Sequence, residues 1–183
     1  MKLGIISDVH DSVRNLRAAL SGLQQVDALL VAGDLCSPFM LPILAEGYEA
    51  GPIHVVFGNN DGDRFRMERV ARSYAHLELH GEAFEGTFDG LAVAMNHFPA
   101  LARTMDTARY AAVVYGHDHR YRVERSDGGW WLDPGSLLGY DPKARAEVPP
   151  TFLVLDLSAD RVDGYQLSRA DVAERIEVTP YRP

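Results

Sequence analysis

Five short apolar runs lie along the chain, and each leads into polar residues. They cover residues 2–7, 28–32, 53–57, 91–95 and 111–115. Runs of this length suit β-strands, and a continuous run such as residues 28–32 is typical of a strand that is buried on both faces of a sheet. We therefore expect five strands whose carboxyl ends lead into polar loops.

Helical patterns follow the first and the third of these runs. Leu16, Ala19, Leu20 and Leu23 recur at a spacing that places them on one face of a helix, and residues 64–74 also have a helical pattern. Strands that alternate with helices favour a parallel sheet in the first half of the chain.

Hairpin signals dominate the second half. Asp89-Gly90 joins residues 83–88 to 91–95, Asp127-Gly128-Gly129 joins 121–124 to 130–132, and a third hairpin joins 152–157 to 162–167. These hairpins add antiparallel strands, so the expected fold is a layered α/β sandwich. Residues 142–150 are expected to form a surface loop. We expect residues 1–183 to form a single domain, because the sequence has no repeat, low-complexity tract or interdomain linker.

The composition narrows the class of protein. With 183 residues and 46% hydrophobic content, the chain can bury a sizeable core. A net charge of −8 argues against a nucleic-acid partner, because proteins that bind nucleic-acid phosphates usually have a basic face. No export signal or membrane-length apolar segment is visible, and one cysteine fits a reducing compartment, so a soluble cytoplasmic protein is expected. Assembly as a homo-oligomer stays open.

The polar residues after the strands are metal-binding types. In an α/β fold, ligands bind beyond the carboxyl ends of the strands, so side chains from these loops can converge there. Asp8 and His10 can point the same way from an extended strand end, and the carboxylate of Asp34 has enough lone pairs to bridge two ions. The candidate metal ligands are Asp8, His10, Asp34, Asn59, His97, His117 and His119.

Oxygen and imidazole ligands without a thiolate suit transition metals better than calcium. We expect two divalent ions, with manganese as the first expectation and iron, nickel, cobalt or zinc as alternatives. Any one of these residues could instead be a helix cap, a turn residue or a buried histidine, and the metal hypothesis depends on their convergence.

The ordered motifs resemble those of the calcineurin-like metallophosphoesterase superfamily. That family pattern is D-x-H, G-D, G-N-[H/C]-D, a histidine, and G-H-x-H. The chain carries Asp8-Val9-His10, Gly33-Asp34, Gly58-Asn59-Asn60-Asp61, His97 and Gly116-His117-Asp118-His119 in this order. Its small size, Asp133-Pro134-Gly135-Ser136 and Pro149-Pro150-Thr151-Phe152 resemble the small bacterial and archaeal phosphodiesterases of the YfcE-like type.

This resemblance implies two mixed β-sheets flanked by helices, in a four-layer αββα sandwich. It implies that Asp8, His10 and His119 bind one ion, that Asn59, His97 and His117 bind the other, and that Asp34 bridges them. It also implies hydrolysis of a small phosphodiester or monoester, in which a hydroxide bridging the ions attacks phosphorus. The candidate catalytic residues are Asp34, Asn59 and Asn60.

Three positions depart from the family pattern. Many relatives have a histidine that protonates the leaving group where this chain has Asn60, and an amide cannot act as a general acid. We therefore expect a preference for good leaving groups such as aryl phosphates. Phe98 follows His97 where the family usually has glycine, so the local backbone is expected to differ. Asp118 lies between two candidate ligands, and its role stays open.

The roles of several other residues also stay open at this point. Asp61 can cap the next helix or orient the motif, whereas Cys36 is expected to be a small buried residue. Arg145 can contact a substrate phosphate or simply face solvent. Residues 133–136 are expected to form a tight turn near the site, and three further histidines are expected to be structural or solvent-facing: His54, His76 and His80.

The alternative to an enzyme is a protein-binding scaffold on the same fold, as in the similar retromer subunit. The complete ligand set argues against that alternative. A nuclease is disfavoured by the net negative charge and by the absence of an added DNA-binding domain.

Overall fold

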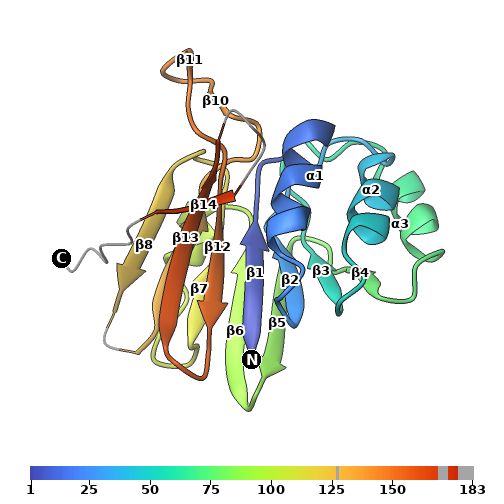
Figure 1. The fold of residues 1–183 in the computed structure, drawn as a ribbon. Helices are drawn as coiled ribbons and strands as arrows, with labels where there is room; N and C mark the ends of the chain where they lie inside the picture. The colour runs from blue at the N-terminus through green and yellow to red at the C-terminus, as the bar shows by residue number, and fades with distance from the viewer. Residues whose placement is uncertain (127, 169–172, 177–183) are drawn as a thin grey trace.

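The computed structural model describes residues 1–126, 128–168 and 173–176, and its largest element is a seven-stranded mixed sheet (Figure 1). The strand order is β14-β13-β12-β1-β2-β3-β4. Four neighbouring strands are parallel: β1 (Lys2–Ile6), β2 (Ala28–Val31), β3 (Ile53–Val55) and β4 (Leu77–Leu79). Three antiparallel strands extend the sheet beyond β1: β12 (Thr151–Asp156), β13 (Arg161–Leu167) and β14 (Ala173–Ile176).

A second, five-stranded mixed sheet packs against the first. Its order is β5-β6-β7-β9-β8, with parallel pairs on both sides of β7 and antiparallel pairs at both edges. The strands are β5 (Ala83–Phe88), β6 (Leu91–Asn96), β7 (Ala112–Val114), β8 (Tyr121–Arg125) and β9 (Trp130–Pro134). The expected class of two mixed sheets is confirmed.

The turns between these strands follow the sequence signals where the structure describes them. Asp89 and Gly90 have φ values of 49° and 78°, as the tight β5–β6 hairpin requires. Strands β8 and β9 pair as expected, although Asp127 of their connection lies outside the described residues.

Helices cover the outer faces unequally. The helices α1 (Val13–Gly22), α2 (Met40–Gly47) and α3 (Arg64–Ala71) lie on one face of the first sheet (Figure 1). The outer face of the second sheet carries only α4 (Pro99–Ala102) among the described helices. The helix expected over residues 64–74 stops at Ala71, because the backbone N–H groups of Ser73 and Tyr74 form tighter turn hydrogen bonds.

Two apolar layers hold these elements together. One lies between the helices and the first sheet and includes Leu16, Leu20 and Leu44. The other fills the space between the two sheets with residues such as Leu30 and Leu132. Alternate residues of central strands such as β1 and β2 therefore face different apolar layers, which fixes the register of these strands and the position of their ends.

The prediction of a surface loop at residues 142–150 missed a short pair of strands. It contains part of a small exposed hairpin, in which β10 (Tyr140–Asp141) pairs with β11 (Ala146–Glu147). Two-residue strands leave too little alternation to detect in a sequence. Within the described residues, no helix combines the length and the apolar character that crossing a membrane requires.

Candidate metal centre

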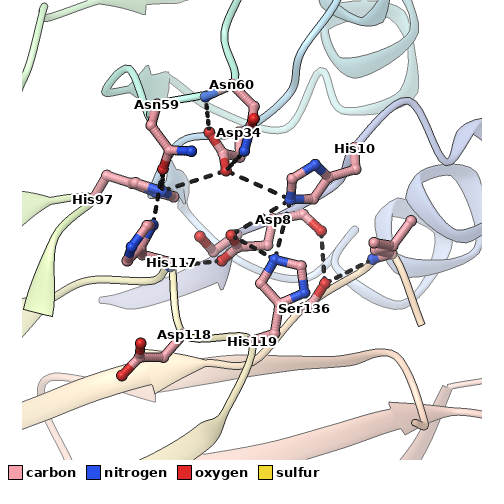
Figure 2. A network of polar contacts seen from close by, with 12 residues as sticks. Asp8, His10, Asp34, Asn59, Asn60, His97, His117, Asp118, His119 and Ser136 are labelled. Carbon is pink, nitrogen blue, oxygen red and sulfur yellow. Dashed lines mark hydrogen bonds and ion pairs between the residues drawn. The ribbon is translucent and has the colours of Figure 1, made fainter. Parts of the chain in front are cut away.

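The seven candidate ligands meet at one edge of the sandwich, where strands of both sheets end (Figure 2). Asp8 and Asp34 follow β1 and β2, and Asn59 follows β3. From the second sheet, His97 comes directly after β6, and His117 and His119 follow β7. The convergence expected from the apolar runs is therefore present.

The backbone is unusual at most of these positions. Positive φ angles are uncommon for residues other than glycine and cost roughly 1–3 kcal/mol each, so they tend to collect at functional sites. Here they occur at five candidate ligands: Asp8 (53°), His10 (45°), Asp34 (57°), His117 (75°) and His119 (56°). These left-handed residues turn the chain sharply after β1, β2 and β7 and so aim successive side chains into one small space.

Glycines allow the loops to approach the site closely. A Cβ atom at Gly58 would overlap Oδ1 of Asp34, and one at Gly116 would overlap Oγ of Ser7 and Oδ2 of Asp8. The glycines of the G-N and G-H motifs are therefore required by packing around the carboxylates.

One group of donors consists of Asp8, His10 and His119. Oδ1 of Asp8 is buried without a hydrogen-bond partner and lies 3.3 Å from Nε2 of His119 and 3.8 Å from Nε2 of His10. The two Nε2 atoms are 3.1 Å apart. Because Nδ1 of His119 donates to the Tyr140 carbonyl at 3.0 Å, the neutral ring presents a lone pair at Nε2. A cation satisfies these converging lone pairs and the unpaired oxygen, so the three residues fit a metal ion.

A second group contains Asn59, His97 and His117. Nδ1 of His97 donates to the Ala32 carbonyl at 2.7 Å, which leaves its Nε2 lone pair facing Oδ1 of Asn59 at 3.1 Å. The same amide oxygen lies 2.8 Å from Nδ1 of His117. This group also fits a metal ion. His97 keeps its place in the site even though Phe98 follows it, and the Phe98 ring packs edge-on against the imidazole.

Asp34 lies between the two groups. Its Oδ2 atom is 3.5 Å from Nε2 of His10 in one group and 3.4 Å from Nε2 of His97 in the other. Asn60 holds this carboxylate from the other side, since its backbone N–H donates to Oδ1 at 2.8 Å and its side-chain amide donates to Oδ2 at 2.9 Å. Asp34 can therefore supply an oxygen to each group.

The electrostatics keep both carboxylates ionised. Burial alone would raise the pKa of Asp8, but the neighbouring His10 and His119 outweigh it and lower that pKa. Burial also opposes ionisation of Asp34, yet His97 and Asn60 lower its pKa. Conversely, burial would lower the pKa values of His97 and His119, but the two carboxylates raise them. A negative, largely buried centre of this kind attracts cations.

The site has a buried side and a solvent-exposed side. Asp8, Asp34 and His97 are buried, whereas Asn59 and His117 are exposed. Solvent and a ligand can therefore approach from the side of Asn59 and His117.

Cys36 has a contact that the sequence did not indicate. It is half-buried rather than fully buried, and its Sγ atom lies 3.4 Å from Nδ1 of His10. Burial and the nearby carboxylates, first among them Asp34, raise the pKa of its thiol to about 12. The protonated sulfur is a poor metal ligand, but it can accept the Nδ1–H of His10 and leave Nε2 of that ring free.

Asp61 orients the motif and does not cap the following helix. Its carboxylate accepts hydrogen bonds from the backbone N–H groups of Asp34, Gly58 and Cys36 at 3.0, 2.7 and 2.8 Å. Asp63 is the residue that caps α3. Of the two alternatives for Asp61, the structure supports the orienting role.

Ser136 hydrogen-bonds the backbone of Asp8. Its hydroxyl donates to the Asp8 carbonyl at 2.9 Å (Figure 2). The backbone N–H of Leu138 donates to the same carbonyl at 2.9 Å. Residues 133–136 lie near the site as expected, but the expected tight turn is wrong, because β9 continues to Pro134 and only Gly135 and Ser136 leave the strand.

Asp118 and Arg145 lie apart from the donor groups. The Asp118 carboxylate points away from them in Figure 2 and is 3.4 Å from Nζ of Lys143 and 3.8 Å from Nη1 of Arg122. Arg145 is exposed between β10 and β11. Of the two alternatives for Arg145, the structure therefore supports the solvent-facing one.

Two facing mixed sheets, with aspartate, histidine and asparagine side chains gathered at their strand ends, define the metallophosphoesterase class of fold. The chain belongs to the calcineurin-like phosphoesterase superfamily, whose domain model matches residues 1–160. The resemblance in the motifs is thereby confirmed.

One curated protein and two solved structures are similar to this chain. Phosphodiesterase MJ0936 of Methanocaldococcus jannaschii is 28% identical over 145 residues, which cover 76% of this chain and 86% of that protein. A solved archaeal phosphodiesterase is 26% identical, with a TM-score of 0.78 over 91% of this chain and all of its own. Vps29 of Entamoeba histolytica, solved in complex with Zn²⁺, shares the fold at 21% identity, with a TM-score of 0.65 over 96% of this chain and 98% of that one.

Proposed function

We propose that this protein is a phosphodiesterase that works with two divalent transition-metal ions. One ion would be held by Asp8, His10 and His119, and the other by Asn59, His97 and His117, with Asp34 shared between them. The single observation that carries the proposal is the position of Asp34 Oδ2, within 3.5 Å of a histidine nitrogen from each group. Manganese is the first candidate, and iron, nickel, cobalt and zinc suit the same donors.

Divalent ions bound at such a site lower the pKa of a coordinated water and neutralise charge on the phosphoryl oxygens. The residues of the chain supply position and charge. Asp34 and Asp8 remain ionised and would hold the cations, and the exposed Asn59 and His117 border the opening through which a small phosphate ester would reach the site.

Asn60 would act as a positioning residue. Its amide donates to Asp34 and has no proton to give to a leaving group, so that proton would come from solvent. Turnover would therefore fall steeply as the pKa of the leaving alcohol rises, and aryl esters would be better substrates than alkyl esters.

The test is hydrolysis of bis(p-nitrophenyl) phosphate by manganese-loaded protein. Asp34→Asn should lose most of the turnover while the far-ultraviolet circular dichroism stays that of the wild type. Asp133→Asn is the matched control, because it makes the same change at another buried aspartate that belongs to neither donor group. Full activity in Asp34→Asn would overturn the proposal.

The likeness to Vps29 supports one rival, a protein-binding scaffold without catalysis. The same assay separates the two functions. Turnover that depends on added manganese and on Asp34 supports the enzyme, whereas metal binding without turnover of any aryl phosphodiester supports the scaffold.

A further inference from the structure

A second cluster of metal-binding side chains lies away from the centre described above. His54 is on β3, Glu78 is its cross-strand partner on β4, and His80 follows β4 by one residue. Alternation along the two strands turns these three side chains away from the helices, since Ile53, Val55 and Leu77 face the helical layer instead. The cluster therefore lies on the face toward the second sheet, at the edge of the sandwich.

The ligand atoms of the cluster converge. Nδ1 of His54 is 3.0 Å from Nε2 of His80, and Oε2 of Glu78 is 3.8 Å from the same Nε2. One ligand atom from each of the three residues lies within 4.8 Å of the other two. Two nitrogens bound to one tetrahedral zinc ion at about 2.0–2.1 Å lie roughly 3.3–3.4 Å apart. Small shifts would bring the three atoms to coordination distances.

The surroundings hold the two imidazoles in place. The Phe84 ring stacks on His54 with centroids 4.6 Å apart and lies 4.5 Å from the His80 ring. Phe88 meets His54 edge-on at 5.8 Å. Burial lowers the pKa values of both histidines, so neutral rings with available lone pairs dominate at pH 7. Glu78 is exposed and can adjust toward an ion.

We propose that His54, Glu78 and His80 form a peripheral Zn²⁺ site that clamps β3 to β4. Two imidazoles and one carboxylate are a zinc donor set, and a water molecule would complete the tetrahedron. The site is separate from the phosphoesterase donor groups and shares no residue with them.

A simple hydrogen bond between the two histidines is the competing explanation. It accounts for the 3.0 Å contact, because one ring can donate to the other. In that explanation Glu78 makes only a long, exposed ion-pair contact of 3.8 Å with the same Nε2 atom. A single ion satisfies all three atoms at once.

A bound ion would act on the strand that leads to Asn59. The backbone N–H of His80 donates to the carbonyl of Val55 at 2.9 Å, and the next bond runs from Phe57 N–H to the Gly81 carbonyl at 2.6 Å. Joining His54 to His80 would strengthen this short parallel pair, and anything that binds only the folded state raises its stability.

Zinc stoichiometry tests the proposal. Chelator-stripped wild type, His80→Gln and Glu78→Gln are equilibrated with Zn²⁺, and bound zinc is measured by mass spectrometry. His80→Gln should bind one equivalent less than wild type, and Glu78→Gln should bind its peripheral zinc more weakly. The control is His76→Gln, because the His76 ring contacts the Ala45 carbonyl and lies in none of the possible metal-binding groups among the described residues.

The zinc content and the zinc affinity of the variants either support or overturn the proposed site. The proposal holds if His76→Gln keeps the wild-type stoichiometry while His80→Gln loses one equivalent and also loses part of the zinc-dependent rise in melting temperature. Equal zinc content in wild type, His80→Gln and Glu78→Gln overturns it. Should His80→Gln fold poorly, the exposed Glu78→Gln variant alone decides, by its zinc affinity. The phosphodiesterase activity of both variants with saturating manganese should equal that of the wild type.

Discussion

Replacing Asn60 with alanine should weaken metal binding more than it slows turnover. The side-chain amide of Asn60 donates to Oδ2 of Asp34 at 2.9 Å, and the backbone N–H, which the substitution retains, donates to Oδ1. The variant therefore loses one of two hydrogen bonds to a carboxylate that lies between both donor groups.

The expected loss of manganese affinity follows from that one hydrogen bond. A hydrogen bond to a charged group contributes about 1.5–3 kcal/mol, and because Asn60 is exposed, water replaces part of it and the lower end applies. About 1.4 kcal/mol is a tenfold change in an equilibrium constant. The manganese concentration for half-maximal activation should rise roughly tenfold, with a much smaller loss of kcat at saturating metal.

The assay is hydrolysis of aryl phosphodiesters over a range of manganese concentrations and leaving-group pKa values. Asn60→Asp should be worse than Asn60→Ala, because it places a second negative charge beside Asp34. If Asn60→Ala leaves the activation constant unchanged but alters the dependence on leaving-group pKa, Asn60 acts on the leaving group and the positioning role is wrong.

Four further predictions concern Gly58, Cys36 and Asp133. Gly58→Ala should abolish activity without unfolding the chain, as checked by circular dichroism, because the added Cβ overlaps the Asp34 carboxylate; an active variant would contradict the packing argument. Cys36→Ala should weaken manganese binding by about 10–100-fold, measured by titration, because it removes the partner of His10 Nδ1. Wild-type Cys36 should also resist iodoacetamide at pH 8, since its thiol pKa is raised to about 12. Asp133→Asn should stabilise the protein at pH 7 more than at pH 5 in urea unfolding. Burial raises the pKa of the Asp133 carboxyl in the folded protein above its value in the unfolded chain. The wild-type carboxyl therefore lowers the free energy of unfolding as the pH rises from the pKa of the unfolded chain toward that of the folded protein. A stability gain in Asp133→Asn that does not vary with pH would refute this.

The sequence predicted the elements whose patterns are long or strongly marked. Continuous apolar runs revealed β1 and β2, and Asp89-Gly90 located a hairpin because only a few residues tolerate its positive φ angles. The candidate ligands were found because they follow these runs, and the ends of parallel strands share one edge.

Other features depend on tertiary contacts that no local pattern encodes. Helix α2 was not expected, because its apolar residues, such as Met40, Leu41 and Leu44, are not separated by polar ones into a clear stripe. The contact of Cys36 with His10 joins two separate loops, and the cluster of His54 with His80 depends on the pairing of β3 with β4. Such contacts become visible only when the chain is folded.

The central claim is that one carboxylate serves two metal ions, and anomalous diffraction from a manganese-soaked crystal tests it most directly. We expect two peaks about 3.5–4 Å apart, one beside Asp8 and His119 and the other beside Asn59 and His97, with Asp34 within bonding distance of both. A single peak in this region, or two peaks of which only one contacts Asp34, would contradict it.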